Sequence, residues 1–207
     1  MQREWEEEPL GDELWHALQA RKRDRDHGLE MLTNLANRGS ALAMMYLGHA
    51  CVSGEDRGQL ALGEEWLIRS AECGSIEGRL QLAFHYQRQE AWEKALVELK
   101  ILTERGYAPA MYHLARALYR GELGYRSVPQ AIHYLNMAKD AGHLPAMGML
   151  SLIYRKEKYG LAGRLRSHWL CITKIPAIVR CVWSYPNSDR LRPFGSFSTA
   201  RSTVTEV

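Results

Sequence analysis

The chain has 207 residues, of which 46% are hydrophobic and 25% are charged, and its formal net charge is +3 at pH 7. This composition is ordinary for a soluble globular protein with a buried core. The charge is uneven: residues 155–207 hold ten Lys and Arg against three Asp and Glu, so the preceding 154 residues carry −4, which argues against a nucleic-acid partner.

The N-terminal segment is acidic, with four Glu among its first eight residues, and we expect it to be solvated. No apolar run follows Met1, so the sequence shows no secretory signal and we expect a cytoplasmic protein. Asp12 is predicted to cap a helix of sequence ELWHALQARKRD. Its apolar stripe is Leu14, Trp15 and Leu18. We interpret residues 1–27 as an acidic N-terminus followed by a capping helix.

A glycine recurs along the middle of the chain with spacings of 35, 32 and 36 residues. The four positions are Gly39, Gly74, Gly106 and Gly142. Each is predicted to end one helix and precede the next, in the left-handed conformation that favours glycine. Polar or glycine-bearing loops are expected at 53–58, 88–92 and 120–129. Each period is therefore predicted to be two antiparallel helices.

Small residues and leucines recur in step with these glycines. Four residues after each glycine lies a small residue: Ala43, Gly78, Ala110 and Ala146. Eight residues after it lies a leucine: Leu47, Leu82, Leu114 and Leu150. Nine residues after it lies another small residue: Gly48, Ala83, Ala115 and Ser151. Seven and eleven residues before them lie Leu32, Leu67, Leu99, Leu135 and Gly28, Gly63, Ala95, Ala131. Spacing of four marks one face of a helix, and small residues allow close helix approach. The pattern predicts an all-α solenoid, because a single repeat cannot bury its own apolar face.

The segments "VPQAIHYL" and "LNMAKDAGHLPAMGMLSLIY" resemble the Sel1-like repeat, a relative of the tetratricopeptide repeat. Residues 94–121 and 130–154 match best, 64–86 match well, and 28–51 form a weaker copy. The resemblance covers about residues 28–165, or about four repeats. It implies a right-handed α-solenoid of antiparallel helix pairs that scaffolds other proteins.

In this solenoid class the first helix of each pair lines the concave side. Positions left over after the packing residues are assigned lie six, ten, thirteen and fourteen residues after each glycine. We predict that they bind a protein or peptide partner, and one end of the surface is basic and aromatic, which suits acidic and apolar anchors. The alternative is that they pack between repeats or carry solvated charge. The predicted groove residues are Met45, His49, Leu80, Phe84, Arg88, Tyr112, Arg116, Tyr119, Arg120, Leu152 and Arg155.

Catalytic and metal-binding motifs are not found in the sequence, so we expect a non-enzymatic protein without cofactor, catalytic residues or metal. The histidines at 85, 113 and 133 are interpreted as helix-surface residues. The four cysteines, Cys51, Cys73, Cys171 and Cys181, are expected to be reduced thiols. A hydrolase of the cysteine-rich Sel1-like type is an alternative, but relatives of that type carry a regular cysteine pair in each repeat.

The C-terminal part is predicted to begin with a last helix over 159–175 that stops at Pro176. Residues 166–185 are apolar and basic, and are interpreted as a cap over the open end of the solenoid. The alternative is an interfacial segment, residues 168–185, that tethers a membrane-associated accessory protein. A spanning helix needs ~20 apolar residues, more than this segment offers. Residues 186–207 are predicted to be a disordered tail.

Overall fold

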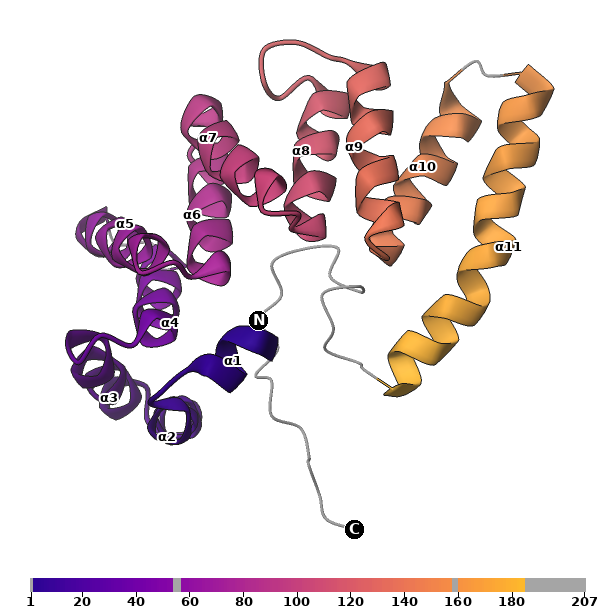
Figure 1. Ribbon diagram of the computed structural model, residues 1–207. Coiled ribbons are helices and arrows are strands. Elements are labelled where there is room, and N and C mark those ends of the chain that lie inside the picture. The colour runs from indigo at the N-terminus through magenta and orange to yellow at the C-terminus, as the bar shows by residue number, and fades with distance from the viewer. Residues whose placement is uncertain (1, 54–56, 158–159, 185–207) are drawn as a thin grey trace. The chain divides into compact units, whose positions relative to one another are not determined.

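The computed structural model describes residues 2–53, 57–157 and 160–184, and the secondary structure within these ranges is helical (Figure 1). The chain divides into two compact units at Glu98 and Leu99, inside helix α7. The helices are α1 (Gln2–Glu7), α2 (Gly11–Arg23), α3 (Arg25–Asn37), α4 (Ala41–Val52), α5 (Arg57–Glu72), α6 (Ile76–Arg88), α7 (Trp92–Glu104), α8 (Ala108–Arg120), α9 (Val128–Asp140), α10 (Leu144–Lys156) and α11 (Gly160–Ser184). The predicted all-α fold is confirmed.

Consecutive helices pack as pairs: α2 with α3 and α4 with α5 in the first unit, and α8 with α9 and α10 with α11 in the second. The four repeated glycines lie in the turns that lead from one pair to the next, each with positive φ: 96° at Gly39, 90° at Gly74, 79° at Gly106 and 81° at Gly142. A side chain is strained there, which is why glycine recurs. The predicted role of these glycines is confirmed.

Small residues let the helices of a pair approach closely. A Cβ atom on Gly48 of α4 would lie 2.9 Å from the carbonyl oxygen of Gly63 on α5 and 2.7 Å from Cγ of Leu67. At the equivalent contact of α10 with α11, the hydroxyls of Ser151 and Ser167 are 2.9 Å apart. All twenty small residues and leucines that the repeat pattern assigned to packing are buried.

The starts of the repeat helices are stabilised in two ways. Ser40 and Ser75 precede α4 and α6, and each hydroxyl accepts a hydrogen bond from the backbone N–H three residues on, at 3.1 and 2.9 Å. In the second unit, α8 and α10 carry Pro109 and Pro145 in their first turn. Proline is favourable there because its missing N–H would have no partner within the helix.

The N-terminal predictions are partly wrong. Helix α2 begins at Gly11, so Asp12 lies inside its first turn and does not cap it, although its charge still suits a helix start. Leu14 and Leu18 are buried as expected, and α2 packs against α3 as the first helix of a pair. The acidic start is not merely solvated, because it forms α1, and Glu4 and Glu8 are both partly buried.

Helix α11 runs through Pro176, so the predicted stop at this residue is wrong. Proline removes one backbone hydrogen bond and clashes with the carbonyl one turn earlier, but here the proline is exposed, so water can solvate the freed carbonyl. The predicted boundary at 165/166 falls inside α11, and that at 27/28 falls inside α3. Whether these two positions separate functional segments of the chain stays a prediction. The predicted tail, 186–207, lies outside the described residues.

Candidate protein-interaction surface

The predicted groove residues lie in both units, and the first unit contains five of them. Met45 is fully buried and Leu80 is 3% exposed, so neither can anchor a partner in this structure. Their helices have neighbours on more than one side, which places these positions in the core. His49 and Phe84 are partly buried, and Arg88 is exposed. Within this unit, then, only the last three reach the surface.

His49 lies in a cationic environment. Burial, together with the positive charges of Arg88 and Arg21, lowers its pKa to about 4. The imidazole is therefore neutral at physiological pH. The sequence did not indicate this, because Arg21 belongs to α2, which the repeat pattern did not include. Arg21 and Arg88 therefore give the surroundings of His49 positive charge.

Helix α8 carries four of the groove residues of the second unit. Tyr112 is buried, with its ring centroid 5.3 Å from that of His113 and 5.2 Å from that of His143. Burial raises the pKa of the Tyr112 hydroxyl, although the charges of Arg116 and Arg120 oppose the shift. The expectation that Tyr112 is an exposed anchor is wrong, because the residue is buried and its ring packs against two histidines.

The next residues on α8 form a basic surface. Arg116 is partly buried, and burial, together with the charge of Arg120 one turn away, lowers its pKa, although Glu122 and Tyr112 oppose the shift. Arg120 is exposed and forms an ion pair with Glu122 at 3.3 Å. On α10, Arg155 is exposed and Leu152 is partly buried. Two arginines one turn apart can bind a carboxylate at two points.

Tyr119 contacts Arg126, which the repeat pattern in the sequence did not include. The guanidinium of Arg126 lies 4.9 Å from the Tyr119 ring centroid and donates to the Tyr119 carbonyl oxygen at 3.0 Å. Arg126 also pairs with Glu157 at the end of α10. Burial and the hydrogen bond and charge of Glu157 raise the pKa of Tyr119. No local signal in the sequence links Arg126 to Glu157, because they are 31 residues apart.

Three histidines lie in the interior. His85, His113 and His143 are each at most 2% exposed, so the interpretation of His85 and His113 as surface residues is wrong, whereas His133 is exposed. His85 Nε2 lies 3.4 Å from a carboxylate oxygen of Glu64. Burial is the main cause that lowers the pKa of both His85 and His113. Over the described part of the chain, no three His, Cys, Asp or Glu residues gather as a metal site would need.

The described cysteines are free thiols. Cys51 is partly buried, which raises its pKa, and Cys73 is exposed. The side chains of Cys171 and Cys181 lie outside the described residues. Cys51 and Cys73 are the pair that the cysteine-rich hydrolase alternative would bridge, and the structure leaves them unbridged.

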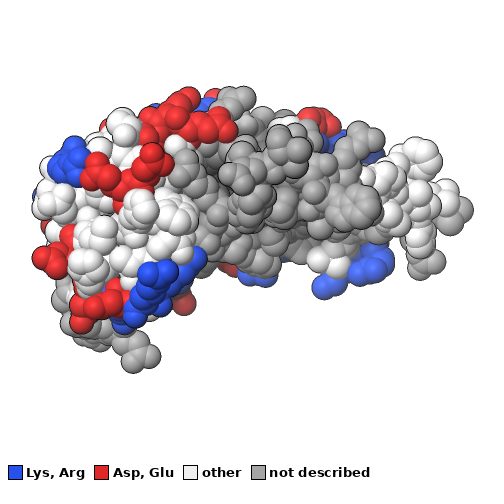
Figure 2. All heavy atoms as spheres, turned by 90° about the horizontal axis from the view of Figure 1, so that it is seen from below, with Lys and Arg blue, Asp and Glu red and all other residues white. Residues whose placement is uncertain are grey.

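Helix α11 has one buried face and one exposed apolar face. Gly163, Ser167 and Leu170 are buried. In contrast, Leu165, Trp169, Ile172 and Ile175 are 61%, 67%, 63% and 61% exposed. Figure 2 shows uncharged side chains at the α11 end of this unit. Among the described residues, no helix combines the length and the apolar character that crossing a bilayer requires.

Repeated antiparallel helix pairs with turn glycines and small-residue contacts define a class of fold, the Sel1-like repeat solenoid. A crystal structure of a Sel1 repeat protein from Oxalobacter formigenes has this fold, with a TM-score of 0.65 and 19% identity, over 80% of this chain and 72% of that chain. A protective antigen present in uropathogenic Escherichia coli strains, described as displaying an SLR fold, gives a TM-score of 0.60 and 21% identity over 74% of this chain. This match spans about a third, 34%, of the antigen's chain.

These likenesses confirm the predicted fold class and the resemblance to Sel1-like repeats. At such identities they establish the fold alone. No family model matches the sequence, and no curated protein matches it.

Proposed function

We propose that this chain is a non-enzymatic scaffold that binds a protein partner through its Sel1-like repeats. The observation that carries the proposal is the basic surface of α8, where Arg116 is partly buried beside the exposed Arg120. A partner carboxylate gains more from a partly desolvated guanidinium than from a fully exposed one, because water screens the pair less. The proposed partner segment is therefore acidic.

The repetition of helix pairs also supports this proposal. A stack of helix pairs presents the same helix face at regular intervals, which suits an extended partner. The neighbouring Leu152 and Arg155 on α10 would contribute one partly exposed apolar contact and one further charge. Tyr112 is not part of the proposed surface, because it is buried. Tyr119 contributes only the part of its side chain that Arg126 does not cover.

The test compares two double variants. Arg116→Ala with Arg120→Ala removes the proposed anchors, whereas Lys100→Ala with Arg105→Ala removes two exposed charges of the same unit near the end of α7. We expect the first variant to lose at least tenfold of its affinity for a partner that the wild type and the control both retain, because each anchor contributes ~2 kcal/mol. Affinity capture with quantitative mass spectrometry identifies the partner, and titration with the purified partner measures the affinity.

Two results would contradict the proposal. Unchanged affinity of the arginine variant would place recognition elsewhere. A melting temperature far below that of the control would make these arginines structural. Circular dichroism on both variants distinguishes the two cases.

A second candidate function is membrane association through residues 168–185. The exposed Trp169, Ile172 and Ile175 favour it, and residues 160–184 include four Lys or Arg and no Asp or Glu. Co-sedimentation with vesicles of phosphatidylcholine alone and with 30% phosphatidylserine tests it. Trp169→Ser with Ile172→Ser should abolish binding to the anionic vesicles. The control, Leu62→Ser with Val97→Ser, changes two exposed apolar residues of other helices and should bind as the wild type does. Equal sedimentation with and without vesicles rejects this function.

A further inference from the structure

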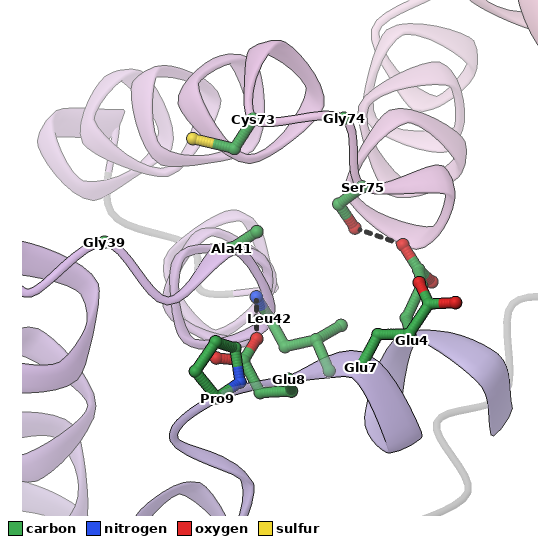
Figure 3. A pocket seen from close by; sticks show the side chains of 10 residues that line it. All are labelled: Glu4, Glu7, Glu8, Pro9, Gly39, Ala41, Leu42, Cys73, Gly74 and Ser75. Carbon is green, nitrogen blue, oxygen red and sulfur yellow. Dashed lines mark hydrogen bonds between the residues drawn. The ribbon is translucent and has the colours of Figure 1, made fainter.

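Helix α1 and Glu8, which directly follows it, contact the rest of the first unit through two carboxylates, each at the start of another helix (Figure 3). Glu4 accepts hydrogen bonds from the backbone N–H of Ile76 at 2.6 Å and from the hydroxyl of Ser75 at 2.9 Å. Glu8 accepts a longer one, 3.5 Å, from the backbone N–H of Leu42. The first N–H groups of a helix have no partner within it and carry partial positive charge. The two carboxylates are therefore bound as a ligand's would be.

An aromatic contact accompanies these carboxylates. The ring centroids of Trp5 and Tyr46 lie 6.3 Å apart, with the rings tilted at 59°. Leu42, Tyr46 and His49 follow one another at helical spacing, so they share a face of α4 with the adjoining Met45. This face includes Met45 and His49, which the sequence predicted to line a binding groove. In the first unit, α1 of the same chain already lies on it.

The fit of α1 is incomplete. A cavity of about 250 Å³ remains beside it, lined by its glutamates and by the turns at Gly39 and Gly74 (Figure 3). Glu6 and Glu7 are exposed. Helix α1 has six residues, and helices shorter than ~12 residues are marginal in water unless packing stabilises them. The contacts of α1 with the rest of the first unit are therefore what keep it helical, and a partner that displaces it must replace them.

We propose that α1 is an intramolecular ligand that occupies an interaction surface formed by the starts of α4 and α6 and by Tyr46. The partner that displaces it is a protein with a short acidic helix whose glutamates flank an aromatic residue. The inference rests on the proposed scaffold function and adds its regulation: while α1 is bound, this surface of the first unit is closed. Recognition consists of the same contacts that Glu4, Trp5 and Glu8 now make.

The test uses the full chain and a fluorescein-labelled peptide of sequence MQREWEEEPL, which corresponds to residues 1–10. Glu4→Ala with Glu8→Ala weakens the internal helix and leaves the surface intact. We expect this variant to bind the peptide at least tenfold more tightly than the wild type does, as measured by fluorescence anisotropy. The matched control is Glu6→Ala, which removes an exposed carboxylate of α1 that does not line the cavity and should exclude the peptide as the wild type does.

Three results would overturn the proposal. The first is that the two variants bind the peptide equally. The second is that a peptide with alanine at the positions of Glu4 and Glu8 binds as well as the native one. The third is that the Glu4/Glu8 variant unfolds, which would make α1 part of the core. The peptide assay uses purified components alone. A failure here is therefore distinct from a failure of the scaffold function, which the arginine variants and partner capture test separately.

Discussion

Replacing Gly48 by alanine should destabilise the protein, although the same change in an ordinary helix stabilises it. Alanine exceeds glycine in helix propensity by ~1 kcal/mol. At this position the new Cβ would lie 2.9 Å from the carbonyl oxygen of Gly63 and 2.7 Å from Cγ of Leu67. Ordinary contact distances are ~3.5 Å, so α4 and α5 would have to separate by about 0.5 Å or more. Overpacking of this kind costs ~1–3 kcal/mol, and the middle of this range exceeds the gain in propensity by about 1 kcal/mol.

The net loss of about 1 kcal/mol, or slightly more, should lower the melting temperature by ~2–4 °C for each kcal/mol in a chain of this size. Thermal denaturation followed by circular dichroism measures it. Gly11→Ala is the control, because its Cβ would meet only one atom, the carbonyl oxygen of Trp5, at 3.7 Å. That variant should melt at or above the wild-type temperature. If Gly48→Ala also does so, the close approach of α4 to α5 does not limit stability, and the packing argument for the repeat is refuted.

Three further predictions concern single side chains. The pKa of His49 in the folded protein, about 4, lies below its ordinary value of 6.5, so the unfolded chain binds a proton first as the pH falls. Stability should therefore fall as pH drops from about 6.5 to about 4. His49→Gln should flatten this part of the melting-temperature profile, and an unchanged slope would contradict the shift. With the other two cysteines replaced by serine, Cys73 should react with a disulfide reagent faster than Cys51, because it is exposed and burial raises the pKa of Cys51; equal rates would reject this difference. Arg79 and Glu98 form a mostly buried ion pair at 2.6 Å, so Arg79→Met should cost ~1–3 kcal/mol and the added change Glu98→Gln should restore part of it in denaturant unfolding; strictly additive losses would mean that the pair is not coupled.

Much of the fold could be predicted from the sequence, because the residues that pack the helices recur at fixed local spacings in each repeat. A glycine such as Gly106 marks a left-handed turn wherever it recurs, and a small residue such as Ala115 beside a leucine marks close helix contact. These requirements are the same in every pair. Each copy therefore supported the assignment of the others, and the register could be predicted without knowing which helices touch.

The candidate surface was predictable only in part. Arg116, Arg120 and Arg155 lie at or near the surface of the second unit, as expected from their spacing. Met45 and Tyr112 fit the same spacing but are buried. Spacing identifies a face of a helix, but whether that face is covered depends on neighbours distant in sequence, such as His143 against the Tyr112 ring.

The sequence by itself determined the class of fold and the positions of the turns, because both depend on residues within one repeat. Tertiary structure alone decided what covers the first helices and how the last one continues. Glu4 reaches the start of α6 across 72 residues, a contact no local pattern indicates. Pro176 remains inside α11 at an exposed position, where water can replace the backbone hydrogen bond that proline removes. The physical reason is the same in both cases: the free energy of a polar group depends on what surrounds it, and in a folded chain those surroundings come from distant residues.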